Sequence, residues 1–199
     1  MDRLQKQIEF ILEADKVKNI LRMTRIADGS RRENDAEHQW HMALMAILLG
    51  EHTAEEDLDL LKVIKIILIH DLVEIDAGDT FCYDQNANLD KKEREEIAAK
   101  RIFGILPKDQ GEELKALWEE FDEMKTPEAK YAAALDRLQP VLLNYMNQGG
   151  TWREHHITKE QVIKRNKPIE NGSPKLWAFA LGLIEDAVIK GYLKEAGEE

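Results

Sequence analysis

The sequence predicts an all-α protein, for three reasons. Apolar residues recur at helical spacing along nearly every segment, and no run shows the alternation typical of a strand. Ser, Thr or Asn stands directly before several of these runs, as at the start of a helix. The 199 residues suffice for one domain with a sizeable core, and no linker or repeat divides them. We therefore expect a single domain over residues 1–199, with a main part at about 10–150 and C-terminal helices at about 158–195 that pack on it or form an interface.

The first half of the chain is expected to form helices separated by loops. Asn34 and Glu37 match the capping-box pattern, in which each side chain bonds the other residue's backbone N–H, so a helix should begin there. The next helix contains the apolar run Val63–Ile69. The expected elements are one or two helices over 3–26, a loop at 29–32, helices at about 34–52 and 57–75, and a loop at 77–88.

The second half is expected to be helical as well. Pro107 separates two charged helices, and Thr126 followed by Pro127 is a clear helix start, because Thr caps the helix and Pro fits its first position. The same pattern recurs at Ser173 and Pro174. The expected helices cover about 89–104, about 109–124, 126 to the glycines at 149 and 150, and 174–191.

Composition narrows the classes of partner. Asp and Glu total 39 against 28 Lys and Arg, and the net charge of −11 repels nucleic-acid phosphates, although a pocket for a small anion needs only two or three cations. The longest apolar run, Leu176–Ile184, is far shorter than the ~20 residues that cross a bilayer, and no signal peptide is apparent. The single Cys82 suits a reducing compartment and excludes a zinc site built from cysteines. We expect a cytoplasmic protein that binds neither nucleic acid nor membrane.

Polar residues occur where the core should be. His70 and Asp71 directly follow the apolar run Val63–Ile69, and burying them unpaired is costly, so they need either hydrogen-bond partners or a metal ion. His38 lies in the first turn of the helix that Asn34 begins. Asp136 lies among alanines and leucines of the helix that begins after Thr126, where a structural role is the alternative. A proline four residues after Asp136 cannot donate to its carbonyl, so a bend is expected beside this polar residue.

The order His38, His70-Asp71, Asp136 resembles the H…HD…D signature of the HD-domain superfamily of metal-dependent phosphohydrolases. The segments 32–38, 69–79 and 136–140 are similar to the subgroup that includes the bacterial 5′-deoxynucleotidases. This resemblance covers about residues 10–150.

The resemblance implies that His38, His70, Asp71 and Asp136 bind a metal. Two imidazoles and two carboxylates form a mixed donor set that suits Mn²⁺, Co²⁺, Fe²⁺ or Zn²⁺. No histidine lies between residues 71 and 135, where relatives with two metals carry extra ones, so we expect one divalent ion per chain. Such an ion can lower the pKa of bound water and polarise a phosphoryl oxygen.

Two acidic residues are candidates for catalysis. Glu74 lies one helical turn beyond His70 and hence on the same face, and the resemblance implies a general acid or base there. The alternative is an ordinary salt-bridged Glu. Asp79, after Gly78, matches a second acid of the family that contacts the substrate or the proton path, with a turn-forming Asp as the alternative.

Arginines upstream of His38 are the candidates for binding a phosphate. The chain has Arg22, Arg25, Arg31 and Arg32 there, and guanidinium binds phosphate oxygens in a fork. The family carries a phosphate-binding Arg followed by Trp. Arg25 is its best counterpart, although Ile26 follows it, and for Arg31 and Arg32 the alternative is a solvated loop.

The resemblance implies a phosphomonoesterase that releases nucleoside and phosphate from deoxyribonucleoside 5′-monophosphates. One alternative is an HD phosphohydrolase that acts on a triphosphate, a cyclic nucleotide or an alarmone. Another is a helical binding or dimerisation module with a structural metal. The family tends to form homodimers or larger assemblies, and the apolar segment Leu176–Ile189 could supply an interface or close the core.

Overall fold

The computed structural model describes residues 2–84 and 86–195, which are mainly helical, so the predicted all-α class is confirmed. The α-helices are α1 (Arg3–Ala14), α2 (Asp35–Leu49), α3 (Leu60–Ile69), α4 (Glu74–Ala77), α5 (Lys91–Phe103), α6 (Lys108–Glu123), α7 (Pro127–Met146), α8 (Gly150–Glu154), α9 (Lys159–Asn166), α10 (Ile169–Gly172) and α11 (Pro174–Ile189). The 3₁₀ helices are η1 (Asp15–Asn19) and η2 (Gly50–His52), and the strands are β1 (Leu21–Arg25) and β2 (Arg32–Asn34).

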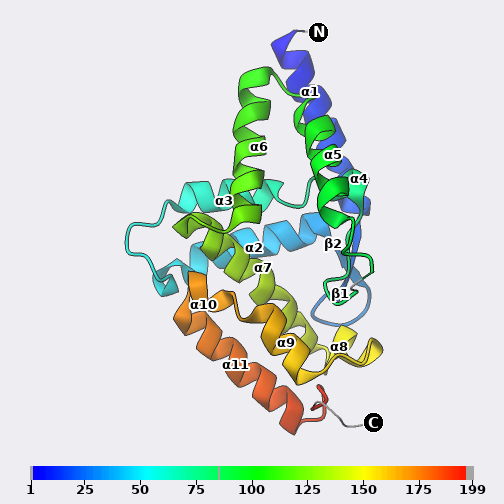
Figure 1. Ribbon diagram of the computed structural model, residues 1–199, viewed down its shortest axis with the longest axis vertical. Helices are drawn as coiled ribbons and strands as arrows, with labels where there is room; N and C mark the ends of the chain where they lie inside the picture. Colours follow the sequence, from blue (N-terminus) through cyan, green and yellow to red (C-terminus); the bar gives the residue numbers. More distant parts are fainter. Residues whose placement is uncertain (1, 85, 196–199) are drawn as a thin grey trace.

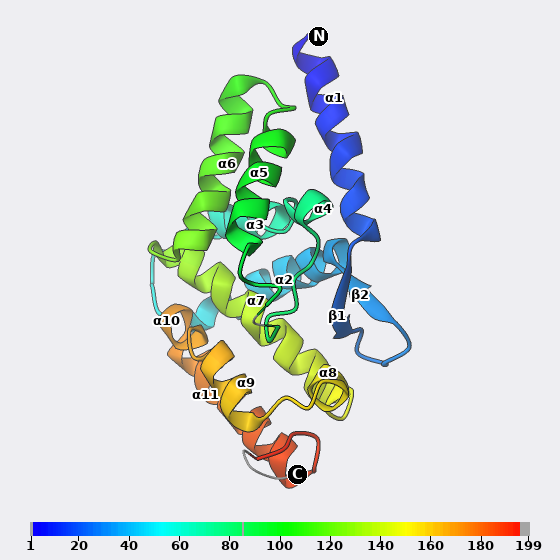
Figure 2. The same ribbon diagram turned by 45° about the vertical axis from the view of Figure 1, so that its right-hand side comes forward.

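Helix α7 runs through the middle of the molecule (Figures 1 and 2). Helices α2 and α3 pack against it, α1, α5 and α6 extend to one end, and α9, α10 and α11 cover it at the other. Helix α1 and the C-terminal end of α11 consequently lie at opposite ends of the molecule. No helix among residues 2–84 and 86–195 is both long and apolar enough to span a bilayer.

The predicted helix starts are confirmed. Asn34 accepts a hydrogen bond from the Glu37 N–H at 2.9 Å, and the Glu37 carboxylate accepts one from the Asn34 N–H at 3.2 Å. The Thr126 hydroxyl accepts from the Ala129 N–H at 3.3 Å. The Ser173 hydroxyl does the same for Leu176 at 3.1 Å. Each cap satisfies an N–H that has no partner within its helix.

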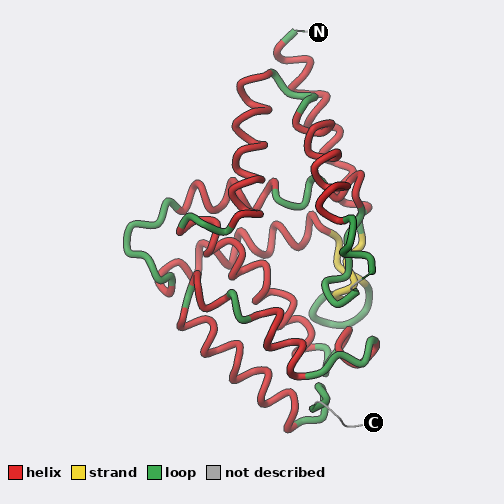
Figure 3. Tube along the Cα trace, viewed as in Figure 1, coloured by secondary structure: helices red, strands yellow, loops and turns green. Residues whose placement is uncertain are grey.

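The prediction of helix over residues 3–26 is wrong beyond residue 19. Among the described residues, β1 and β2 form a two-stranded antiparallel sheet in which Arg25 lies opposite Arg32 (Figure 3). Gly29 has a φ of +72°, which closes the connection between them at little steric cost. Strands of five and three residues are too short to show a clear alternation of apolar and polar residues, which is why the sequence did not predict them.

The predicted helix at 57–75 is interrupted near its C-terminal end, at the residues His70 and Asp71. Helix α3 stops at Ile69, and His70 to Val73 form turns before α4 begins at Glu74. Hydrogen bonds of the tighter 3₁₀ type hold this segment, including Leu72 N–H to Ile69 C=O at 3.2 Å. Apolar periodicity cannot reveal such a break, because the turns keep the side chains buried.

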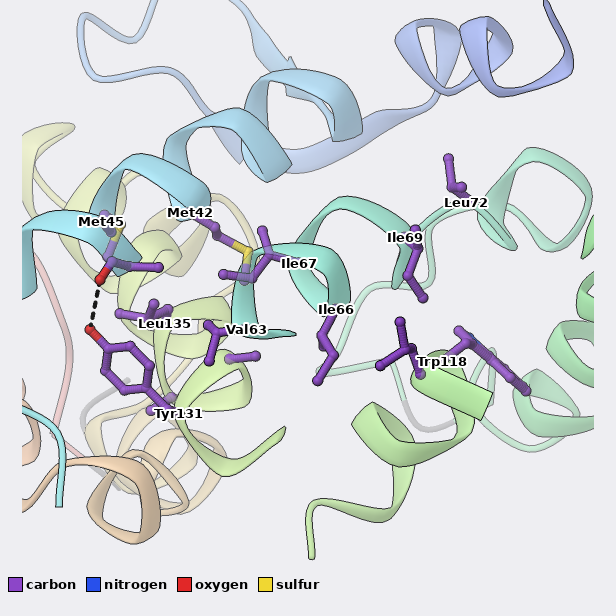
Figure 4. Close-up of a cluster of buried hydrophobic side chains, with 14 of the residues drawn as sticks. Met42, Met45, Val63, Ile66, Ile67, Ile69, Leu72, Trp118, Tyr131 and Leu135 are labelled. Atoms are coloured by element: carbon purple, nitrogen blue, oxygen red, sulfur yellow. Dashed lines mark hydrogen bonds between the residues drawn. The ribbon is translucent and has the colours of Figure 1, made fainter. Parts of the chain in front are cut away.

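The core lies between α2, α3 and α7 (Figure 4). Met42, Ile66 and Leu135 are fully buried there, and the Tyr131 hydroxyl donates to the Ala46 carbonyl at 3.5 Å. A second cluster, which includes Val141 and Ile184, joins α7 to α11. The buried face of α11 therefore packs against α7.

We expect Ile66→Ala to lower the free energy of unfolding by about 2–5 kcal/mol, because Ile66 is 0% exposed and its loss leaves a cavity. Leu61 on the same helix is 66% exposed, and Leu61→Ala should change that free energy by less than about 0.5 kcal/mol. Urea denaturation measures both values. Equal losses in the two variants would contradict the packing in Figure 4.

Candidate metal centre

The four predicted metal ligands converge from three parts of the chain. His38 comes from α2, His70 and Asp71 from the turn after α3, and Asp136 from α7. Ligand atoms of His38, His70 and Asp71 lie within 4.8 Å of one another. Asp136 Oδ1 is 3.2 Å from His38 Nε2 and 3.9 Å from His70 Nε2. The two imidazoles and two carboxylates thus face a common point.

Hydrogen bonds on the far side of each ring fix both imidazoles. His70 Nδ1 donates to the Ile67 carbonyl at 2.8 Å, so in the neutral imidazole Nε2 is the nitrogen with a free lone pair. His38 Nδ1 contacts Gln139 Oε1 at 3.1 Å, and the Gln139 amide in turn donates to the Glu33 carboxylate at 2.6 Å. Metal-binding histidines are typically oriented by such outer contacts.

The charges of this cluster favour a bound cation. Burial lowers the pKa of His70, but the Asp71 and Asp136 carboxylates outweigh it and raise this pKa to about 10. Burial raises the pKa of Asp136, yet His38 and His70 hold it well below its ordinary value. His70 Nε2 is buried and makes no hydrogen bond to the part of the chain that the structure describes. A nitrogen without a partner beside acceptor-only carboxylates is the donor set of a divalent transition metal, so these residues fit the expected ion.

The arginine that lies at this centre is Arg22, and not one of the three that the sequence analysis favoured for binding phosphate. Its guanidinium is 2.9 Å from Asp71 Oδ2, 3.3 Å from Asp35 Oδ1 and 3.9 Å from Asp136 Oδ1. The β1 strand carries Arg22 there, which the expected helix over 3–26 concealed. Only the presence of Arg22 in the upstream arginine cluster pointed to it in the sequence.

The three arginines proposed from the sequence do not line the cavity that opens from this centre. Arg25 pairs with Glu154 at 3.0 Å, and Arg31 pairs with Glu37 at 2.6 Å. Arg32 is exposed on β2.

Glu74 and Asp79 both line the pocket beside the cluster. Glu74 is 5% exposed, and its Oε2 has no hydrogen-bond partner among the described residues. Burial, together with the Asp71 and Asp35 carboxylates, raises the pKa of Glu74 well above its ordinary value. Burial also raises the pKa of Asp79. Glu74 can therefore hold a proton next to the centre.

A cavity of about 290 Å³ opens from the centre, at the lower end of the range for ligand pockets. Its wall includes His70, Asp71 and Asp136 together with aromatic side chains such as Tyr83 and Trp152. Three cations that the sequence analysis missed also line it, namely Lys91, Arg137 and Arg165. Arg137 lies in the segment 136–140 that resembles the family, but nothing in that segment assigned it to a pocket, and Lys91 and Arg165 lie outside every motif.

The chain is similar to proteins of known family. A family model described as HD domain matches residues 14–177. A crystal structure of a predicted metal-dependent phosphohydrolase from Magnetospirillum magnetotacticum MS-1 is 51% identical with a TM-score of 0.93, and the match covers 96% of each chain.

Curated relatives carry the name 5′-deoxynucleotidase HDDC2. The human protein is 33% identical over 112 residues, which are 56% of this chain and 53% of the human one. The protein from Dictyostelium discoideum is 30% identical over 149 residues, 71% of this chain and 77% of that one. The chain spans about half the length of the human, mouse and cattle relatives. Because the family model covers most of the chain and the H…HD…D residues meet at one centre, the protein belongs to the HD domain family, and the resemblance read from its sequence is confirmed.

Proposed function

We propose that the protein is a metal-dependent phosphomonoesterase that hydrolyses deoxyribonucleoside 5′-monophosphates to nucleoside and phosphate. The observation that carries this proposal is the buried cluster of two histidines and two aspartates that faces a ligand-sized pocket, with Glu74 beside it. The names of the 5′-deoxynucleotidase relatives support the substrate class. A module with a purely structural metal would have no need of a pocket or of an unpartnered carboxyl at the metal.

His38, His70, Asp71 and Asp136 would hold the metal in this proposal, with one ion per chain and Mn²⁺, Co²⁺, Fe²⁺ or Zn²⁺ as candidates. A divalent ion in such a site activates water and polarises the phosphoryl group. Gln139 and the Ile67 carbonyl keep the two imidazoles oriented towards the centre.

The remaining residues of the site would handle the proton and the phosphate charge. Breaking the P–O bond leaves an alkoxide on the nucleoside that must take up a proton, and the buried Glu74 carboxyl is placed to hold one. Arg22 contacts Asp71 and can offset the negative charge of the phosphate. Asp79, on the same wall, would contact the substrate or the proton path.

We expect phosphate release from deoxyribonucleoside 5′-monophosphates that requires metal. The assay uses protein stripped of metal and reloaded with Mn²⁺, Co²⁺, Zn²⁺ or Mg²⁺, and a panel of mono-, di- and triphosphates in deoxy and ribo forms. Release from ribonucleotides or triphosphates alone would contradict the substrate class. No release from any of them with metal bound would contradict the phosphomonoesterase.

We also propose that the protein is a cytoplasmic homodimer or larger homo-oligomer. The outer face of α2 supports this assembly, because Trp40, Ile47 and Leu48 are 65%, 57% and 63% exposed at helical spacing. An apolar stripe of this kind fits a second apolar surface.

A further inference from the structure

Two arginines in the pocket have no acidic partner. Arg137 on α7 and Arg165 on α9 both line the cavity that opens from the metal centre. Among residues 2–84 and 86–195, no carboxylate oxygen lies within 4.0 Å of either guanidinium. The other cations of the pocket differ, since Arg22 is 2.9 Å from Asp71 and Lys91 is 3.4 Å from Glu95.

The Arg137 guanidinium is fixed by contacts with neutral groups, which do not balance its positive charge. It is 9% exposed, donates to the Ala133 carbonyl at 3.0 Å and contacts Met124 Sδ at 3.5 Å. Its Nε is buried and has no hydrogen-bond partner within the described ranges of the chain. A buried guanidinium with only neutral acceptors is unfavourable unless another group supplies negative charge.

Arg165 adds a second positive charge nearby. Helix α9 lies along α7 (Figure 2), which brings Arg165 to the same cavity. Arg137 and Arg165 therefore bring two positive charges to the wall of one cavity. In a chain with a net charge of −11, such a pair of unmatched cations favours an anion between or beside them.

We propose that Arg137 and Arg165 bind a second phosphate group of the substrate, separate from the phosphate that is cleaved at the metal centre. This inference rests on the proposed function and extends its substrates to nucleoside bisphosphates, in which the 5′-phosphate monoester is cleaved and the second phosphate stays on the sugar. Two guanidiniums match the charge of about −2 on a phosphate monoester, whereas the carbonyl of a base supplies only a dipole. Among residues 2–84 and 86–195, Arg22 lies 2.9 Å from Asp71 and 3.9 Å from Asp136, whereas neither Arg137 nor Arg165 is within 4.0 Å of these carboxylates, so we place the second phosphate away from the one that is cleaved there.

Binding measurements test this proposal without relying on turnover. The probes are deoxyadenosine 5′-monophosphate, 5′-diphosphate and 3′,5′-bisphosphate, titrated calorimetrically into Mn²⁺-loaded Glu74→Gln protein. We expect the 3′,5′-bisphosphate to bind about tenfold or more tightly than the monophosphate, as charge-assisted hydrogen bonds to one extra group provide. The 5′-diphosphate carries its second phosphate on the first, and tighter binding of this probe than of the bisphosphate would contradict the proposal.

Arg165→Gln in the same background should remove this advantage, so that the affinity ratio falls to about one. Lys164→Gln is the matched control, since it removes a positive charge from the exposed neighbouring residue of α9 and should preserve the ratio. Equal affinity for all three probes, or an advantage that survives Arg165→Gln, would overturn the proposal. Hydrolysis of the monophosphate by wild-type protein is measured separately, and its absence would count against the proposed function and not against the second phosphate site.

Discussion

His70→Ala should lose the bound metal and reduce the rate of phosphate release by about a thousandfold or more, because the ion supplies several kcal/mol of transition-state stabilisation. His70 Nε2 faces Asp71 Oδ1 at 3.1 Å and has no hydrogen-bond partner among residues 2–84 and 86–195. The methyl group of alanine offers no donor atom, so the remaining three residues would bind the ion weakly.

Metal content by mass spectrometry and thermal unfolding measure this loss together. An ion that binds only the folded state raises its stability, so Mn²⁺ should raise the Tm of the wild type and leave that of His70→Ala nearly unchanged. His52→Ala is the matched control, because His52 lies in η2 and does not line the pocket. Full metal content in His70→Ala, with a folded protein by circular dichroism, would remove His70 from the ligand set.

Much of the fold could be predicted because its signals are local. The caps at Asn34, Thr126 and Ser173 each involve residues three positions apart, and the structure has all three. The hairpin of β1 and β2 escaped prediction because pairing joins residues across a loop, and strands this short leave no periodic pattern.

The candidate site likewise contains residues that local motifs could identify and residues that only tertiary contacts bring together. The H…HD…D residues could be proposed from motifs, and the structure brings them to one centre, while their role as metal ligands stays a prediction. The sequence did not assign Arg22 to the site, because β1 carries it there and this strand was not predicted. Arg137 and Arg165 meet only through the packing of α9 on α7, and a sequence of this net charge does not single out individual cations.

Glu74→Gln should keep the metal and lower kcat by about a hundredfold to ten-thousandfold, the usual contribution of a positioned general acid or base. The amide has nearly the same shape as the carboxyl but cannot give up a proton to the leaving oxygen. Steady-state kinetics on a deoxyribonucleoside 5′-monophosphate, together with metal content, measure both expectations.

The division between kcat and KM decides what Glu74 does. A fall in kcat with an unchanged KM indicates that Glu74 acts in the transition state, whereas a higher KM with an unchanged kcat would indicate that it only binds substrate. Asp76→Asn is the matched control, because Asp76 lies on the same helix, bonds Arg101 and does not line the pocket. Asp76→Asn should retain the wild-type kcat. If Glu74→Gln does so too while holding its metal, the buried carboxyl is structural and the proton for the leaving oxygen must come from another group, of which Asp79 is the candidate on the same wall.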